Sequence, residues 1–170
     1  MLSGLRTERL CMIPWTEALV RAVVDAPASL QRIKGITVAD GFPNHPVRHF
    51  VLPATLAAIE KDPSYGRWSG LVVHSQDRRV IGSMGCKSPP DDQGLVEIGY
   101  DIVPAYQHQG YATEIGRAFV DWLQNETSVR RIAAECLADN VASIRVLEKT
   151  GFNRIEERES MTYWELPTHK

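Results

Sequence analysis

Hydrophobic side chains recur along the chain with two different spacings, and together these spacings predict a mixed α/β fold. Apolar residues at every second position, or in short continuous runs, are typical of strands, whereas recurrence every three to four positions is typical of amphipathic helices. Strand-like spacing covers residues 5–15, 67–74, 79–86, 95–103, 130–137, 152–159 and 161–166. Helix-like spacing covers residues 16–24, 45–61, 113–123 and a short stretch that begins at Asn140. The predicted order is therefore β-α-α-β-β-β-α-β-α-β-β.

Turn-forming residues separate these elements. Polar clusters at 75–78 and 89–94 join three successive strands, which predicts an antiparallel meander. Pro27 ends the first helix or begins another one. Residues 35–46 contain several glycines and prolines and are expected to be irregular.

Two of the predicted helices indicate which of their faces is buried. In the helix at 113–123, Ile115, Phe119 and Leu123 recur at helical spacing on one face. In the helix at 45–61, Pro53 marks a kink or the true start. The residues expected on the buried side of that second helix are Phe50, Leu52, Leu56 and Ile59.

Composition narrows the class of protein. A chain of 170 residues is most simply one domain, spanning residues 1–170, and can bury a sizeable core. The net charge of −2 and the pI near 6.2 give no basic footprint for nucleic acid. Cys11, Cys86 and Cys136 are widely spaced, which suggests neither a zinc site nor a disulfide framework, so reduced thiols are expected. Cys86 and Cys136 lie in predicted strands and are expected in the core. No apolar run reaches the ~20 residues of a membrane span, and no signal peptide is evident, so we expect a cytoplasmic location.

The most informative stretch is Gln107-His108-Gln109-Gly110-Tyr111-Ala112, which joins a predicted strand to a predicted helix. The first N–H groups of a helix have no partner inside it, and the helix dipole makes that end positive. Gly110 allows the backbone to approach a ligand closely, and Ala112 keeps the start of the helix uncluttered. The stretch therefore predicts a phosphate or diphosphate site.

The same stretch carries a resemblance to a known family. Q-H-Q-G-Y-A fits the Gln/Arg-x-x-Gly-x-Gly/Ala signature of the Gcn5-related N-acetyltransferases (GNAT), which bind acetyl-CoA. It follows E-I-G-Y on a strand, and N-V-A-S-I-R-V-L-E-K-T-G-F, from Asn140 to Phe152, is similar to a second segment of the family. The opening L-R-T-E-R-L-C-M-I-P-W resembles the branch that includes the ribosomal-protein N-acetyltransferases. The resemblance implies the GNAT fold, an α/β (α+β) fold with a central, mixed, mostly antiparallel sheet of about seven strands flanked by about four helices.

The resemblance also implies where the cosubstrate binds. The strand at 95–103 would splay away from the strand at 130–137, and the pantetheine arm would lie in the gap as an added strand. Backbone groups of the 107–112 loop would hold the diphosphate, and Asn140 would contact the pantetheine or cap its own helix. The residues implied in cofactor binding are Ile102, Val103, Gln107, His108, Gln109, Gly110, Tyr111, Ala112, Asn140 and Ser143.

Acid–base candidates follow from the same comparison. Many family members carry a tyrosine seven residues after the asparagine as the proton donor to the thiolate, but here that residue is Leu147. Ser143 matches the suspected donor of the ribosomal-protein branch, and water is the alternative. Glu97 is the expected general base and Glu135 the second candidate. We expect Glu114, in the first turn of its helix, to be structural.

The sequence defines less clearly the side of the site that would bind the acceptor amine. Alternation places Glu97, Gly99 and Asp101 on one face of their strand, and Tyr100 is expected to line the acceptor side. Other residues expected to line the acceptor pocket are Phe42, His45 and Trp68. His45 and His49 have the spacing of two metal ligands on a helix, but nothing nearby completes a site, so no metal is expected.

These features predict an acetyl-CoA-dependent N-acetyltransferase that moves the acetyl group directly to a primary amine in a ternary complex, stabilising the oxyanion through backbone N–H near Val103. The amine belongs to a protein N-terminus or to a small molecule. A CoA-binding sensor without turnover is the alternative, because Leu147 cannot transfer a proton. A third class, a nucleotide-binding α/β domain, is disfavoured because G-x-x-x-x-G-K-[ST] is absent. Neither nucleic acid nor membrane is an expected partner, and both a monomer and a homodimer fit.

Overall fold

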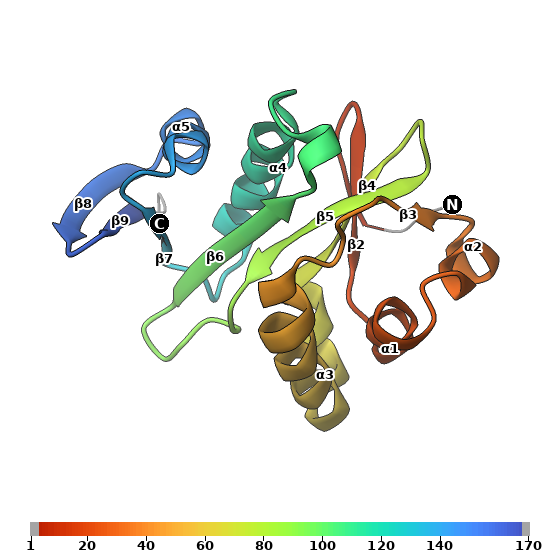
Figure 1. Cartoon of the computed structure of the whole chain (residues 1–170). Helices are drawn as coiled ribbons and strands as arrows, with labels where there is room; N and C mark the ends of the chain where they lie inside the picture. The colour runs from red at the N-terminus through yellow and green to blue at the C-terminus, as the bar shows by residue number, and fades with distance from the viewer. Residues whose placement is uncertain (1–3, 168–170) are drawn as a thin grey trace.

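The computed structural model describes residues 4–167, in which nine strands form one sheet (Figure 1). The strand order is β1-β2-β4-β5-β6-β7-β9-β8, and β3 pairs with β5 outside this path. The strands are β1 (Leu5–Arg6), β2 (Leu10–Pro14), β3 (Thr37–Val38), β4 (Ser69–His74), β5 (Arg79–Cys86), β6 (Leu95–Ile102), β7 (Arg131–Leu137), β8 (Asn153–Arg158) and β9 (Met161–Pro167). The α-helices are α1 (Glu17–Asp25), α2 (Ser29–Lys34), α3 (Leu52–Lys61), α4 (Tyr111–Asn125) and α5 (Val141–Lys149).

This architecture confirms the predicted mixed sheet and the meander β4-β5-β6. The predicted number of strands was too low by two, because β1 and β3 are two-residue strands. Strands that short show no hydrophobic period and are defined only by their partners, β2 for β1 and β5 for β3. The additional helix α2 follows Pro27, at the point where the sequence left open whether another helix begins.

Helices cover both faces of the sheet. Figure 1 shows α4 on one side and α1 and α3 on the other, where α1 and α3 pack on each other. Gly116 of α4 lies over Met84 of β5, since a Cβ at Gly116 would be 3.8 Å from Met84 Cε. The predicted buried face of α4 is confirmed, because Ile115, Phe119 and Leu123 are all buried.

The predicted helix at 45–61 is two elements. Residues Val47–Val51 form a π-helical turn that continues into α3. Pro53 stands in the first turn of α3, a position that tolerates proline although proline has no backbone N–H to donate. The prediction that Phe50 is buried was wrong, because its side chain is 67% exposed. A π-turn has more residues per turn than an α-helix, so the 3.6-residue period does not hold across it.

The three cysteines, Cys11, Cys86 and Cys136, are free and buried, which confirms the predicted core positions of Cys86 and Cys136. Burial raises the pKa of the Cys86 thiol to about 12, so it is not a nucleophile at neutral pH. Within the described part of the chain, no helix has the length and apolar character needed to cross a membrane.

Candidate functional site

The site begins at a gap in the sheet between β6 and β7. These two parallel strands pair only over Leu95–Ile98 of β6, opposite Arg131–Ala134 of β7. Beyond Ile98, β6 stays paired with β5, and β7 stays paired with β9 along its whole length. The ends of β6 and β7 therefore diverge, and each presents a free edge to the space between them.

The hydrogen bonds of β6 decide which backbone groups face this gap. Val103 N–H donates to Ile81 O at 2.8 Å, and Val103 O accepts from Tyr106 N–H at 3.0 Å. Both polar groups of Val103 are thus committed, and its backbone is not free for a ligand. Because hydrogen-bonding direction alternates along a strand, the preceding residue, Ile102, aims its N–H and C=O at the gap. Of the two residues predicted to offer backbone groups, only Ile102 is placed to do so, and it does so through its N–H, because its C=O accepts from the Gln107 side chain.

The loop after β6 is held in shape by its glutamine side chains. Gln107 Nε2 donates to Ile102 O at 2.7 Å, and Gln109 Nε2 donates to Ala105 O at 3.3 Å. His108 has a φ of 63° and Gly110 a φ of 82°, both left-handed. Left-handed residues in tight turns direct backbone N–H groups into concave arrays that bind anions.

Helix α4 begins directly at this loop. Gly110 is its N-cap residue and carries no capping side chain, and the first bond within the helix runs from Glu114 N–H to Gly110 O at 3.0 Å. The N–H groups of the first turn, at Tyr111, Ala112 and Thr113, therefore have no partner inside the helix. The helix dipole adds positive character at this end, which favours a bound anion.

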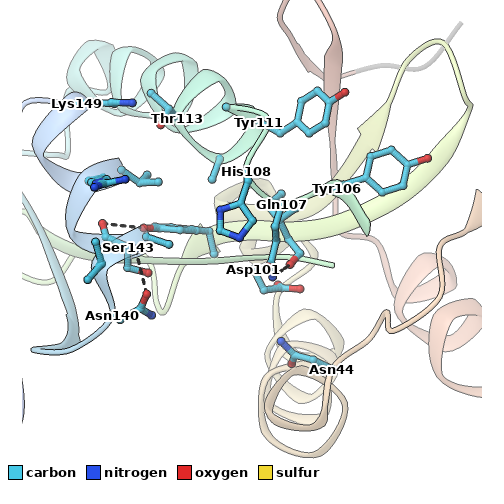
Figure 2. Close-up of a pocket in the computed structure, with 18 residues that line it drawn as sticks. Asn44, Asp101, Tyr106, Gln107, His108, Tyr111, Thr113, Asn140, Ser143 and Lys149 are labelled. Carbon is cyan, nitrogen blue, oxygen red and sulfur yellow. Dashed lines mark hydrogen bonds between the residues drawn. The ribbon is translucent and has the colours of Figure 1, made fainter. Parts of the chain in front are cut away.

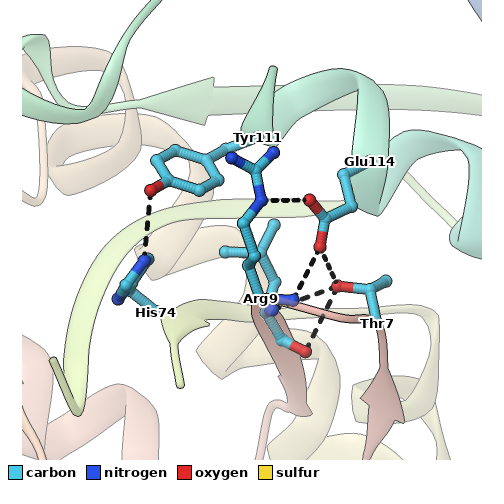
Figure 3. A network of polar contacts seen from close by, with 6 residues as sticks. Thr7, Arg9, His74, Tyr111 and Glu114 are labelled. Carbon is cyan, nitrogen blue, oxygen red and sulfur yellow. Dashed lines mark hydrogen bonds and ion pairs between the residues drawn. The ribbon is translucent and has the colours of Figure 1, made fainter. Parts of the chain in front are cut away.

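A polar network fixes the first turn of α4 to the N-terminal strands (Figure 3). Glu114 accepts hydrogen bonds from Thr7 Oγ at 2.6 Å, from Arg9 N at 2.9 Å and from Arg9 Nε at 2.6 Å. The Arg9 guanidinium lies 4.3 Å from the centre of the Tyr111 ring, and the Tyr111 hydroxyl is 3.1 Å from His74 Nε2. Burial opposes ionisation of Glu114, but these donors outweigh it and hold its pKa below the ordinary value. The predicted structural role of Glu114 agrees with these contacts.

A cavity of about 650 Å³ passes through the gap. Figure 2 shows Asn44 and Asp101 on one side of β6, and Thr113 and Lys149 on the other. Residues predicted to bind the cosubstrate line this cavity from three elements, β6, the loop with the start of α4, and α5. They are Ile102, Gln107, His108, Gly110, Tyr111, Ala112, Asn140 and Ser143.

On the α5 side, Asn140 caps its helix. Its Oδ1 accepts from Ser143 N–H at 3.1 Å. The Tyr100 hydroxyl, from β6, donates to Ser143 O at 3.4 Å, and burial raises the pKa of Tyr100. Leu147 is only 1% exposed, so it belongs to the core and not to the cavity.

The two glutamates predicted as bases lie away from the cavity. Glu97 and Glu135 share Lys87, whose Nζ forms an ion pair with each of them, at 3.1 Å for Glu135. Asp101 lies in the cavity wall instead, where it accepts a hydrogen bond from the Ser83 hydroxyl. Burial raises the pKa of Asp101 from its ordinary value near 3.8 to about 6. Alternation along the strand predicted that Asp101 shares a face with Glu97 and Gly99, but it gave no sign that Asp101 is buried. The burial depends on the neighbouring strand β5.

Of the residues expected on the acceptor side, Tyr100 lines the cavity, whereas Phe42, His45 and Trp68 do not. Phe42 and Trp68 are each 7% exposed and pack in the core, Trp68 with its ring centre 5.5 Å from that of Trp122. The centres of the His45 and His49 rings are 4.3 Å apart, and the two ring planes are tilted by 43°. Burial stabilises large apolar rings, so Phe42 and Trp68 pack in the core. Asn44, which lies between Phe42 and His45 in the sequence, lines the cavity instead. Among residues 4–167, no group of three or more metal-ligating side chains comes together.

Comparisons with known proteins all point to acetyltransferases. A family model described as an acetyltransferase (GNAT) domain matches residues 9–153. Over 106 residues the chain is 27% identical to the uncharacterized N-acetyltransferase YjdG of Bacillus subtilis, an alignment that covers 62% of this chain and 63% of YjdG. It is 30% identical over 100 residues to YoaA of the same organism, covering 59% of this chain and 55% of YoaA. The matches thus span less than two thirds of the length of these relatives.

Solved structures of similar fold cover nearly the whole chain. The ribosomal-protein-S5-alanine acetyltransferase of Vibrio fischeri has a TM-score of 0.70 at 17% identity, with 98% of this chain and 97% of that one covered. The ribosomal L7/L12 α-N-protein acetyltransferase RimL, solved in complex with coenzyme A, has a TM-score of 0.68 at 13% identity, with 97% and 98% covered. At these identities the likeness shows the fold.

Proposed function

The chain belongs to the GNAT acetyltransferase family, and on this premise we propose that it transfers an acetyl group from acetyl-CoA to a primary amine. The observation that carries the proposal is the free set of N–H groups at the start of α4, which opens onto a gap between two diverging strands. A diphosphate matches the first feature and an extended amide chain matches the second. RimL was solved with coenzyme A and shares this fold.

The residues present fit the parts of acetyl-CoA one by one. The N–H groups of Tyr111, Ala112 and Thr113 face the diphosphate position, and the cations Arg145 and Lys149 also line the cavity. The edge of β6 beyond Ile98 is not paired with β7, and its backbone groups can pair with the pantetheine amides. Asn140 is committed to its capping bond with Ser143, so its amide nitrogen is the group left for the cosubstrate.

Chemistry at the thioester needs a donor for the developing oxyanion and a proton for the departing thiolate. The Ile102 N–H takes the role of oxyanion donor in this proposal, because Val103 N–H is bonded to β5. Two hydroxyls, those of Tyr100 and Ser143, lie on the α5 side and can protonate the thiolate. The buried cysteines offer no covalent relay, so transfer is direct and initial-rate kinetics should give intersecting lines.

One observation favours a second function, a CoA-binding regulator without turnover. Leu147 occupies the position where many relatives carry a catalytic tyrosine, and it is buried in the core. A protein without this donor still binds the cosubstrate.

Protein N-terminal amines are our first choice of acceptor, with small-molecule amines second. The reduced, buried thiols fit a reducing compartment such as the cytoplasm.

The test combines calorimetry with CoA and a thiol-release assay on a panel of amines, including peptides that begin with Ala or Ser. Binding with release on at least one amine supports the transferase. Binding without release on any amine supports the regulator. Absence of CoA binding refutes both.

A charge placed at the start of α4 tests the site itself. Ala112→Asp puts a carboxylate among the N–H groups, which suits a helix N-terminus but repels a diphosphate by at least ~1 kcal/mol at contact distance. CoA affinity should fall about fivefold or more, with no loss of thermal stability. Ala18→Asp is the matched control, because Ala18 is also the second residue of an exposed helix start, in α1, away from the cavity. Equal loss of affinity in both variants would contradict the assignment.

A further inference from the structure

We propose that Asp101 receives the acceptor amine and takes its proton before acetyl transfer, and that the acceptor reaches it along the face of β6 whose floor is Gly99. This inference rests on the proposed function and adds to it a base and a class of acceptor. The base is not one of the glutamates that the family resemblance indicated.

Position on the sheet is the first argument. Met84 of β5 pairs with Tyr100 of β6 and lies under α4, so Tyr100 points to the α4 side. Its neighbour Asp101 therefore points to the opposite side, as Figure 2 shows. Asp101 directly precedes Ile102, whose N–H faces the gap. An amine bound at Asp101 thus meets the thioester from the side opposite the thiol-protonating hydroxyl of Tyr100.

Surroundings of the carboxyl group are the second argument. Among the residues that the structure describes, Asp101 forms no ion pair, and its side chain is held by the Ser83 hydroxyl. The titratable and charged groups that share its cavity are Tyr100 on β6, Tyr106 and His108 on the following loop, Tyr111 on α4, and Arg145 and Lys149 on α5. A partly buried carboxyl with a pKa of about 6 is basic enough to accept a proton near neutral pH.

The face of β6 that carries Asp101 is open beside Gly99. A Cβ added to Gly99 would meet no atom within 4 Å, although Gly99 lies within a sheet strand. Glu97, Gly99 and Asp101 share one face by alternation, so Gly99 forms the floor between two acidic residues. At the far end, Glu97 and Glu135 share the single cation Lys87, which leaves that end negative. Such a surface attracts protonated amines.

The pKa of the acceptor then decides its class. Transfer of a proton to a carboxylate with a pKa of about 6 is unfavourable by about 100-fold from an α-amine and by about 10⁴-fold from a lysine side chain. Asp101 therefore favours α-amines and other weakly basic amines over lysine.

The proton and bond balance is complete without another reactant. The ammonium gives one proton to Asp101, which later releases it to solvent. The neutral nitrogen forms a bond to the thioester carbon, and the carbon–sulfur bond breaks. The second nitrogen proton is lost as the thiolate gains one, which leaves an amide and a free thiol.

The test compares pH–rate profiles of the wild type, Asp101→Asn and Glu97→Gln with an Ala-initiated peptide as acceptor. In the wild type, kcat/KM should fall below about pH 6. Asp101→Asn should lose at least 100-fold in kcat/KM together with that acid limb, while its CoA affinity by calorimetry stays unchanged. Glu97→Gln should keep the limb. If Asp101→Asn keeps both rate and limb, or if the limb disappears in Glu97→Gln, the inference is wrong.

Two further comparisons complete the test. Gly99→Val should raise KM for the peptide at least tenfold with CoA affinity unchanged, because the new side chain stands in the open route. Unchanged KM would overturn the proposed path. The wild type should also use the α-amine peptide at least tenfold better than Nα-acetyl-lysine, and the reverse preference would overturn the class of acceptor. A wild type without thiol release on any amine refutes the proposed function itself, a different outcome from an active enzyme that does not need Asp101.

Discussion

Replacement of Asp101 by Asn should make the protein more stable at the pH where it works. Asp101 is a carboxyl group whose pKa burial raises to about 6, so its ionised form is disfavoured in the folded state. Asn has nearly the same shape, carries no charge and can still accept the hydrogen bond from Ser83. The substitution therefore removes a cost of folding without opening a cavity.

The magnitude and its sign follow from linkage. Between the ordinary pKa near 3.8 and the folded value of about 6, the native state holds more protons than the unfolded state. The contribution of Asp101 to stability therefore falls as pH rises through this window, and the loss is complete above it. The difference between the two pKa values corresponds to about 3 kcal/mol. In a protein of this size that would raise Tm by about 6–12 °C.

The measurement is urea unfolding of the wild type and the variant from pH 4 to pH 8, with the difference in unfolding free energy plotted against pH. The two proteins should be equally stable near pH 4, and the variant should be more stable by up to about 3 kcal/mol at pH 8. Ser83→Ala is the control of opposite sign. It removes a donor to the carboxylate and should destabilise the protein at pH 8 by about 1 kcal/mol.

Two outcomes would refute the reasoning. If Asp101→Asn is less stable than the wild type at pH 8, the carboxylate must have partners that compensate its burial. If the difference does not change with pH, Asp101 titrates alike in the folded and unfolded chain. The expected result, an inactive but more stable variant, is typical of residues that serve function at the expense of stability.

Two further predictions concern residues around the cosubstrate. Asn140→Ala should cost about 1 kcal/mol of stability through the lost cap and should also weaken CoA binding. Thr16→Ala, which removes the equivalent cap of α1, should cost similar stability and leave CoA affinity unchanged. Chemical denaturation measures the stability and calorimetry the CoA affinity, and equal CoA affinity in both variants would show that Asn140 is only a cap. Glu114→Gln should destabilise the protein by about 1–2 kcal/mol at pH 7, because the pKa of Glu114 is lowered in the folded state. The difference should be lost as pH falls from the ordinary value of 4.5 through the lower folded pKa, and a difference independent of pH in unfolding experiments would contradict this assignment.

Local patterns predicted much of the fold and the cosubstrate side of the site. Helix α4 follows from the recurrence of Ile115, Phe119 and Leu123, and its uncapped start at Gly110, the proposed anion site, follows from a strand, a glycine and a helix start in succession. Both depend on interactions between residues close in sequence, where spacing alone determines the face and the free N–H groups. For the same reason the cap formed by Asn140 could be predicted.

Features that depend on pairing between distant segments needed the tertiary structure. The bond from Val103 N–H to Ile81 O decided that Ile102, and not Val103, faces the gap. The position of β5 beside β6 decided that Asp101 is buried against Ser83, while Glu97 reaches Lys87 instead of the cavity. The amino-acid sequence by itself thus determined the element pattern, the family and the shape of the turn proposed to bind an anion, because these are local. Burial and hydrogen-bond partners decided which residue is proposed as the base and which strand edge is free, because the pKa of a side chain and the availability of an N–H are set by whatever packs beside them.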